Sequence, residues 1–211
     1  MKIKLSAKNV RITGDKVIID VDDDQIDSLF RKVQLSTLNI GDKFKIDDEV
    51  FIVLDHADKG TLVTSEKLFW VSGAFGNCSD WNVSAVREIL NGGYYKKIAS
   101  IVGKENIIPM RRDLTSLDGL DDYGEVTDNI SLLTAAEYSK YRKVLGLNRK
   151  FSDWQWLITP VSTPSNGYSH HVVCVNDVGA LVWGDCFYPT KCTRPVFTLN
   201  PNICVVSVAK Y

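Results

Sequence analysis

The sequence predicts an α+β fold, with short helices in the first half of the chain and an antiparallel β meander in the second. Two observations support this. Apolar residues recur at helical spacing between positions 84 and 145, and short alternating runs divided by turn residues fill the chain from Trp154 onward. A small hairpin-plus-helix segment precedes both. We therefore predict an N-terminal appendage at 1–36 and a main domain at 37–211.

Composition narrows the class of protein. The 211 residues are 45% apolar and 24% charged, as in ordinary globular proteins. A net charge of -1 with no long basic run argues against a dedicated surface for duplex nucleic acid. No apolar run is long enough to predict membrane insertion. The odd number of cysteines, five, and the lack of an apolar leader after Met1 predict reduced thiols and a cytoplasmic protein.

The residue pattern of the N-terminal part predicts two hairpins with a helix between them. The first spans 10–21 with its turn at 13–16, and the second begins at Gly41 and turns at Asp47-Asp48. Between them, residues 24–35 place Ile26, Leu29 and Val33 at helical spacing. A short strand is expected at 61–64.

The middle of the chain predicts short helices joined by loops. A helix over 84–90 is expected to end at Asn91-Gly92-Gly93, and a second over 94–102 to end at Gly103. Residues 103–129 show little periodicity and are predicted to be one long loop. Thr134 with Glu137 forms the pattern of a capping box and predicts another helix start.

The C-terminal part predicts strands and turns. Trp154, Trp156 and Ile158 alternate, which predicts a strand with buried indoles. Residues 171–175 are apolar on both faces and predict a central strand. The turn at 176–179 leads back into 180–183, and further strands are expected at 195–199 and 203–208.

Several short motifs occur in a fixed order. They are Gly41-Asp42-Lys43-Phe44, Ile52-Val53-Leu54, Trp81-Asn82-Val83-Ser84, Leu90-Asn91, Ser131-Leu132-Leu133-Thr134, the 154–160 run Trp-Gln-Trp-Leu-Ile-Thr-Pro, the 173–179 run Val-Cys-Val-Asn-Asp-Val-Gly, and Arg194-Pro195. In this order they resemble a domain family of unknown function in Firmicute, phage and prophage proteins. The family usually has Gly-Val where this chain has Cys192-Thr193, and a basic residue near His170 and His171.

The resemblance implies a fold and a type of function. The family resembles C-type-lectin-like and formylglycine-generating-enzyme-like folds, including display proteins of phages. In such folds a rigid frame carries the binding loops. The resemblance therefore implies a C-type-lectin-like binding domain over the main part of the chain.

Aromatic and polar residues near the C-terminal turns are the candidate ligand contacts. Trp and Tyr are enriched in binding hot spots, and a ligand surface here competes with simple packing of the loops. Both interpretations stay open from the sequence. The candidate ligand-binding residues are Tyr168, His170, Trp183, Phe187, Tyr188 and Lys191.

Catalytic and metal chemistry have weaker signals. Cys174, Cys186 and Cys192, with the two adjacent histidines, lack the spacing of a zinc site, so buried thiols are the preferred interpretation. The aspartates between 113 and 128 do not follow the EF-hand pattern, and solvated loop charge is preferred to calcium binding. No phosphate-binding loop, dinucleotide fingerprint or nucleophile elbow is present. We therefore predict that the protein is not an enzyme and that it has no catalytic residue, metal or cofactor.

These observations lead to three hypotheses. The first is a phage- or prophage-encoded, non-catalytic binding protein whose C-terminal loops recognise a protein or a host-surface ligand, with residues 1–36 mediating docking or homo-oligomer formation. The second is an intracellular inhibitor of a host enzyme or defence system, such as a CRISPR nuclease. The third is an unrecognised metal or thiol enzyme. The expected location is the host cytoplasm, with assembly into a virion as a further destination.

Overall fold

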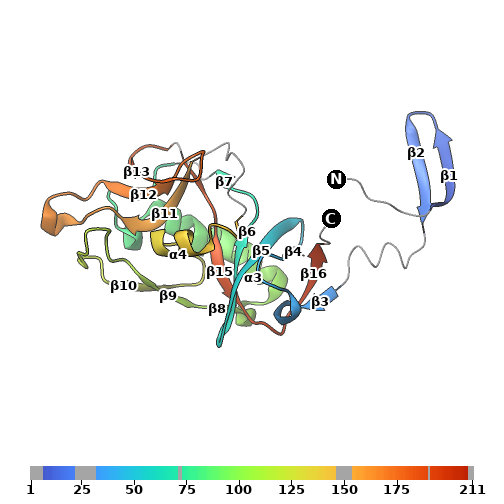
Figure 1. The fold of residues 1–211 in the computed structure, drawn as a ribbon, viewed down its shortest axis with the longest axis horizontal. Helices are drawn as coiled ribbons and strands as arrows, with labels where there is room; N and C mark the ends of the chain where they lie inside the picture. Colours follow the sequence, from blue (N-terminus) through green and yellow to red (C-terminus); the bar gives the residue numbers. More distant parts are fainter. Residues whose placement is uncertain (1–6, 22–31, 71–72, 146–153, 190, 209–211) are drawn as a thin grey trace.

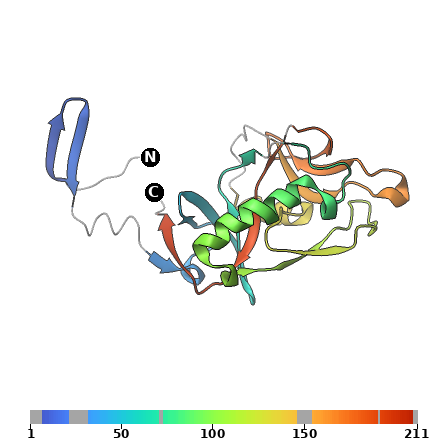
Figure 2. The same ribbon diagram turned by 180° about the vertical axis from the view of Figure 1, so that it is seen from behind.

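The protein has an α+β fold with one long helical segment and several sheets (Figures 1 and 2). The computed structural model describes residues 7–21, 32–70, 73–145, 154–189 and 191–208. The expected fold class is confirmed at this level.

The largest sheet has seven strands and curls into a half-barrel. Its strand order is β3-β16-β4-β5-β6-β15-β8. All of its pairings are antiparallel, and they join strands from both halves of the chain. The strands are β3 (Lys32–Gln34), β4 (Lys43–Ile46), β5 (Glu49–Ala57), β6 (Gly60–Ser65), β8 (Ile107–Ile108), β15 (Val196–Leu199) and β16 (Cys204–Val208).

The second sheet has five strands and lies at the other end of the main body (Figure 1). Its order is β13-β12-β11-β14-β7, so β12 is an interior strand with a neighbour on each side, as predicted. The expected C-terminal meander is confirmed only for β11, β12 and β13, because β14 runs parallel to β11 and β15 pairs with β6. The strands are β7 (Phe69–Trp70), β11 (Gln155–Pro160), β12 (His171–Val175), β13 (Leu181–Asp185) and β14 (Cys192–Thr193).

The predicted break at Asn91-Gly92-Gly93 is wrong. The chain stays helical from α2 (Ala85–Ile89) through a π-helical turn at Leu90–Tyr94 into α3 (Tyr95–Val102), the long segment in Figure 2. The Asn91 amide donates to the carbonyl of Ile130 at 2.8 Å, and its side-chain oxygen accepts from the Ile130 N–H at 3.1 Å. These contacts hold the π-turn against a distant segment. Gly103, with φ of 86°, ends the helix as expected.

Helix α4 (Ala135–Tyr141) begins at the predicted capping box. The Thr134 hydroxyl accepts from the Glu137 N–H at 3.1 Å, and the Glu137 carboxylate accepts from the Thr134 N–H at 2.8 Å. The remaining helical turns are short 3₁₀ segments at Leu35–Thr37, Trp81–Val83, Lys104–Asn106 and Pro164–Asn166.

The predicted long loop at 103–129 is only partly a loop. Residues 110–113 and 125–128 form a two-stranded antiparallel hairpin, β9 (Met110–Asp113) and β10 (Glu125–Asp128). Alternation in β9 is clear, since Met110 and Arg112 are buried while Arg111 and Asp113 are exposed. The alternation was hidden in the sequence because the buried residue at 112 is an arginine.

The first predicted hairpin is confirmed as β1 (Ala7–Thr13) and β2 (Lys16–Val21). Val10 pairs with Ile19 and Ile12 with Val17, so four exposed aliphatic residues share one face. Most of the predicted helix at 24–35 lies outside the described residues. Its last part is wrong, because Lys32–Gln34 form β3 and pair with β16.

Two apolar cores fill the main body. The larger one lies between the half-barrel sheet and the long helical segment and includes Trp81, Trp156 and Phe197. The smaller one packs Tyr138 of α4 against Val173 and Val175 of β12. Trp156 is buried as predicted, but Trp154 is 38% exposed, which corrects the expectation that both indoles are core residues.

Candidate functional site

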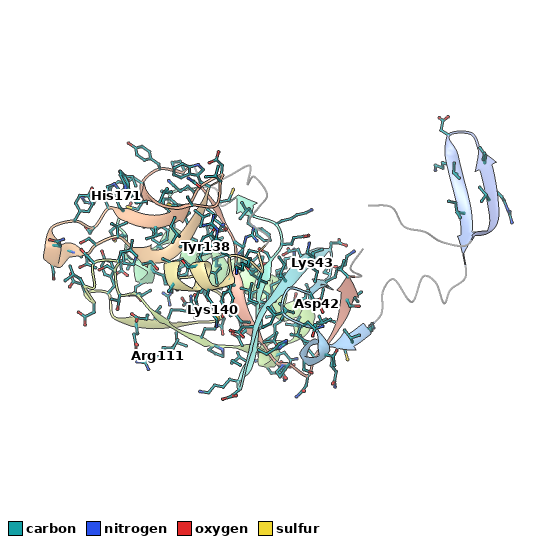
Figure 3. All side chains as sticks on the ribbon, in the orientation of Figure 1. Asp42, Lys43, Arg111, Tyr138, Lys140 and His171 are labelled. Carbon is teal, nitrogen blue, oxygen red and sulfur yellow. The ribbon has the colours of Figure 1, made fainter. Side chains whose placement is uncertain are left out.

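His171 belongs to a row of aromatic rings and lies at the end of the main body that carries β12 and β13, opposite Asp42 and Lys43 (Figure 3). Successive ring centroids are 4.3 Å apart for Trp183–His171, 4.9 Å for His171–Tyr168, 6.0 Å for Tyr168–His170 and 5.8 Å for His170–Phe187. We call these five residues the aromatic row. Trp183 is 61% exposed, and the rings of Tyr168 and Phe187 are also exposed.

The β12–β13 hairpin positions the row. Its turn is held by Asn176, whose side-chain oxygen accepts from the N–H groups of Val178 and Ala180, and Gly179 supplies the positive φ of 76°. At the other end, the carboxylate of Asp185 accepts from the N–H of Phe187 at 2.9 Å. The carbonyl of Asp185 accepts from the N–H of Tyr188, which is itself 61% exposed.

A second turn places Tyr168 in the row. Pro164 opens a 3₁₀ turn, and Gly167 ends it in the left-handed conformation with φ of 68°. The Tyr168 N–H then donates to the carbonyl of Thr163 at 3.3 Å. Loop residues thus depend on local turn chemistry, while the strands give them a rigid base.

Five of the six predicted site residues lie in or beside the row, and Lys191 does not. Lys191 is only 5% exposed, and its Nζ lies 4.1 Å from the centroid of the Trp156 ring. Gly184 makes room for it, because a Cβ at that glycine would lie 2.4 Å from Lys191 Cε. The buried side chain of Lys191 therefore packs against β13 at Gly184 and supports that strand. His171 was missed as a site residue; its position at the end of an alternating strand was the available signal.

A small apolar hollow adjoins Trp183. Its volume is about 160 Å³. We call it the edge hollow, and it is lined by Leu117, Ala135, Val161, Val173, Leu181, Val182 and Trp183. The Leu117 N–H donates to the carbonyl of Pro160 at 3.0 Å, which fixes one wall. The edge hollow is suited to a single apolar side chain of a ligand.

The surroundings of the row are acidic. Segments 113–124 and 161–189 contain no Lys or Arg but carry Asp113, Asp118, Asp121, Asp122, Asp177 and Asp185. Ser165 joins the two segments by donating its N–H and its hydroxyl to Asp122, each at 2.8 Å. Hydrogen bonds from Ser116 and Ser162 lower the pKa of Asp118, and those from Ser165 lower the pKa of Asp122. These carboxylates are therefore ionised at neutral pH.

The candidate metal and thiol groups are not gathered into a centre. Among the described residues, no group of three or more His, Cys, Asp or Glu side chains is placed to hold a metal ion. Cys174, Cys186 and Cys192 are buried. Burial raises the pKa of Cys174 to about 12 and that of Cys186 to about 11, which disfavours the nucleophilic thiolate. The geometry gives no support to thiol chemistry at these positions.

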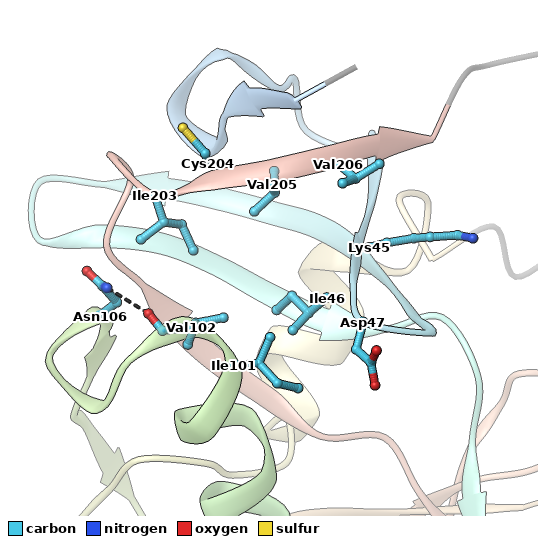
Figure 4. Close-up of a pocket in the computed structure, with 10 residues that line it drawn as sticks. All are labelled: Lys45, Ile46, Asp47, Ile101, Val102, Asn106, Ile203, Cys204, Val205 and Val206. Atoms are coloured by element: carbon cyan, nitrogen blue, oxygen red, sulfur yellow. Dashed lines mark hydrogen bonds between the residues drawn. The ribbon is translucent and has the colours of Figure 1, made fainter. Parts of the chain in front are cut away.

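A larger hollow lies at the opposite end, between α3, β4 and β16 (Figure 4). Its volume is about 360 Å³, and Ile46, Ile101 and Val205 supply much of its apolar lining. The Asn106 amide on its wall is engaged with the Val102 carbonyl at 2.7 Å. Because this polar group is already satisfied by the protein, the hollow is a weaker ligand candidate than the aromatic row.

The frame beneath the row depends on a buried ion pair whose strength varies with pH. Burial raises the pKa of Glu137, but Arg112 more than offsets this, so the pKa lies below the usual value of 4.5. A carboxylate whose pKa is lower in the folded than in the unfolded protein stabilises the fold at pH values above its unfolded-state pKa. This stability is lost as the pH falls through its folded-state pKa. We expect the stability advantage over Glu137→Gln to shrink below pH 4.5. Urea unfolding of both proteins from neutral pH to about pH 3 measures it, and a constant difference would contradict it.

No protein-family model, curated protein or solved structure gives a significant match to the chain. Among the described residues, every helix is too short or too polar to cross a bilayer. The aromatic row, the edge hollow and the acidic segments around them are therefore the features of the molecule that indicate a function.

Proposed function

We propose that the protein is a non-catalytic binding protein whose aromatic row contacts a protein ligand. The exposure of the row carries the proposal. Large apolar side chains that are exposed side by side mark interaction sites on soluble proteins. Trp183 in the row and Tyr188, next to Phe187 in the chain, are each 61% exposed and belong to the residue types that dominate binding energies.

The proposal includes a C-type-lectin-like scaffold and a phage or prophage origin. The ordered motifs at 41–44, 154–160 and 173–179 support it. The separation between scaffold and binding residues also supports it, because paired strands carry the turns on which the proposed ligand-binding residues lie. Self-association through the N-terminal hairpin stays a prediction, motivated by its exposed face of Val10, Ile12, Val17 and Ile19.

The acidic segments favour a basic protein as the ligand. Proteins that bind nucleic acids present such basic surfaces. This charge pattern therefore supports the second hypothesis, an intracellular inhibitor of a host nucleic-acid enzyme such as a CRISPR nuclease, as a specific form of the proposed binding function. Steering by opposite charge would also speed association at low salt.

We expect Trp183→Ala combined with Tyr188→Ala to remove ligand capture. Truncating two exposed aromatic hot-spot residues lowers affinity by about tenfold or more. Tagged protein is incubated with soluble and envelope fractions of bacterial lysate, and bound proteins are quantified by mass spectrometry. The matched control is Ile40→Ala combined with Val83→Ala, because these exposed apolar residues belong neither to the aromatic row nor to the hollows described above. A protein that the control retains and the aromatic variant loses supports the proposal; equal capture by both variants refutes it.

A further inference from the structure

The outer edge of the five-stranded sheet is open. Strand β13 is the terminal strand, and in the part of the chain that the structure describes no strand pairs with its outer side. Natural proteins usually protect such an edge with Lys, Pro or a β-bulge. The β13 sequence, Leu-Val-Trp-Gly-Asp, contains neither residue, and its register with β12 is regular.

The hydrogen-bond pattern shows which backbone groups face outward. Next to the turn, the Asn176 N–H donates to the Ala180 carbonyl at 3.0 Å, and at the far end the Cys186 N–H donates to the His170 carbonyl at 2.8 Å. In an antiparallel pair, hydrogen-bonded and non-hydrogen-bonded pairs alternate. Residues 182 and 184 therefore bond to β12, whereas Leu181 and Trp183 direct their N–H and C=O groups away from the sheet.

The side chains beside this edge form a place for an apolar residue. Leu181 and Trp183 pair directly with Val175 and Val173, so all four share one face of the sheet. That face contains the edge hollow, which Leu181, Trp183 and Val173 line. A strand added along β13 would direct alternate side chains toward the edge hollow.

Charge at both ends of the edge indicates the character of the added strand. Asp177 precedes β13 in the turn, and Asp185 is its last residue. With no Lys or Arg between 161 and 189, a segment with basic residues on both sides of an apolar centre is complementary to this edge.

We propose that β13 accepts an extended segment of a partner protein as an additional strand. An apolar residue of that segment fills the edge hollow, and flanking basic residues lie near Asp177 and Asp185. Main-chain hydrogen bonds to residues 181 and 183 would supply affinity, and the edge hollow and the carboxylates would supply specificity. This inference rests on the proposed binding function and specifies how the ligand is held.

The test compares Leu181→Pro with Leu181→Ala. Both variants lose the leucine side chain, but only proline removes the outward N–H, and proline is tolerated on edge strands where its nitrogen faces solvent. Peptides of random sequence are selected by display on the immobilised full-length protein, and the enriched peptides are synthesised. We expect alternating apolar residues flanked by Lys or Arg, with Leu181→Pro binding them about tenfold or more weakly than Leu181→Ala by fluorescence anisotropy.

N-methylated peptides provide a second measurement on the unmodified protein, so the test does not depend on how the proline variant folds. Methylation at every second residue removes the N–H groups that would face β13, and methylation at the intervening residues does not. We expect only the first set to lose affinity. Equal tolerance of both sets, or equal binding by the two Leu181 variants, overturns strand addition.

The outcomes also separate this inference from the function on which it rests. Lysate capture that depends on Trp183 and Tyr188 but not on the N–H of residue 181 keeps the binding function and rejects strand addition. Sedimentation of the free protein tests a second copy as the occupant of the edge. A dimer that Leu181→Pro, but not Leu181→Ala, converts to a monomer would overturn the partner-segment proposal.

Discussion

Replacing Arg112 with Ala is expected to lower the free energy of unfolding by about 3–5 kcal/mol, because it leaves a half-buried carboxylate without its partner. The Arg112 guanidinium donates to Glu137 at 2.9 and 2.5 Å and to the Leu132 carbonyl at 2.9 Å. Its side chain is only 6% exposed. A bidentate pair of this kind is stronger and geometrically more specific than a single hydrogen bond.

The neighbouring arginine supplies a matched control. Arg111 also pairs with a carboxylate, that of Glu125, but its side chain is 75% exposed. Exposed ion pairs contribute roughly 0–1 kcal/mol, so Arg111→Ala should change stability little. Urea unfolding of the two single variants measures the contrast. Equal, small effects would show that the buried pair does not stabilise the frame.

Loss of the Arg112–Glu137 ion pair should also affect the aromatic row. Glu137 belongs to α4, and the hydroxyl of Tyr138 in the same helix donates to the Gly179 carbonyl at 2.9 Å, in the turn of the β12–β13 hairpin. Arg112 therefore connects the β9–β10 hairpin to the helix that supports the proposed binding surface. We expect ligand binding by Arg112→Ala to fall together with its folded fraction.

Local signals in the sequence predicted local structure well. The capping box of Thr134 and Glu137, the turn at Asp47 and the helix end at Gly103 were confirmed because each depends on groups within a few positions. The helix end at Asn91 was wrong because its side chain bonds to Ile130, far along the chain. Tertiary contacts of this kind override helix propensity and are not visible in a single sequence.

The candidate site was predictable only where local signals determine it. Aromatic residues near turns could be identified as exposed candidates, and Trp183 and Tyr188 are exposed. The burial of Lys191 could not be predicted, because it depends on the space that Gly184 leaves in β13 and on the ring of Trp156 in β11. The edge position of β13 also required the full strand order, which no local pattern encodes.

Replacing Trp81 with Ala is expected to lower the free energy of unfolding by about 3–5 kcal/mol, since a fully buried aromatic side chain leaves a large cavity. Trp81 is 0% exposed and packs against Phe75, with ring centroids 6.0 Å apart. Its Nε1 donates to the carboxylate of Asp128 at 2.6 Å, and Arg87 binds the other oxygen of the same group. Trp81 therefore contributes both packing and a charge-assisted hydrogen bond.

Substituting Phe for Trp81 and, separately, for Trp156 distinguishes these two contributions. Both indoles are buried against Phe75, but in the part of the chain that the structure describes only that of Trp81 makes a hydrogen bond. Trp156 is 1% exposed and packs on the same Phe75 ring, at 5.4 Å, but among the described residues its Nε1 has no hydrogen-bond partner. Trp81→Phe leaves a buried carboxylate with a lost donor, so it should cost about 1–3 kcal/mol more than Trp156→Phe. Chemical unfolding of both Phe variants measures the difference. If the two cost the same, the stability of Trp81 comes from packing alone, and Asp128 draws its support from Arg87.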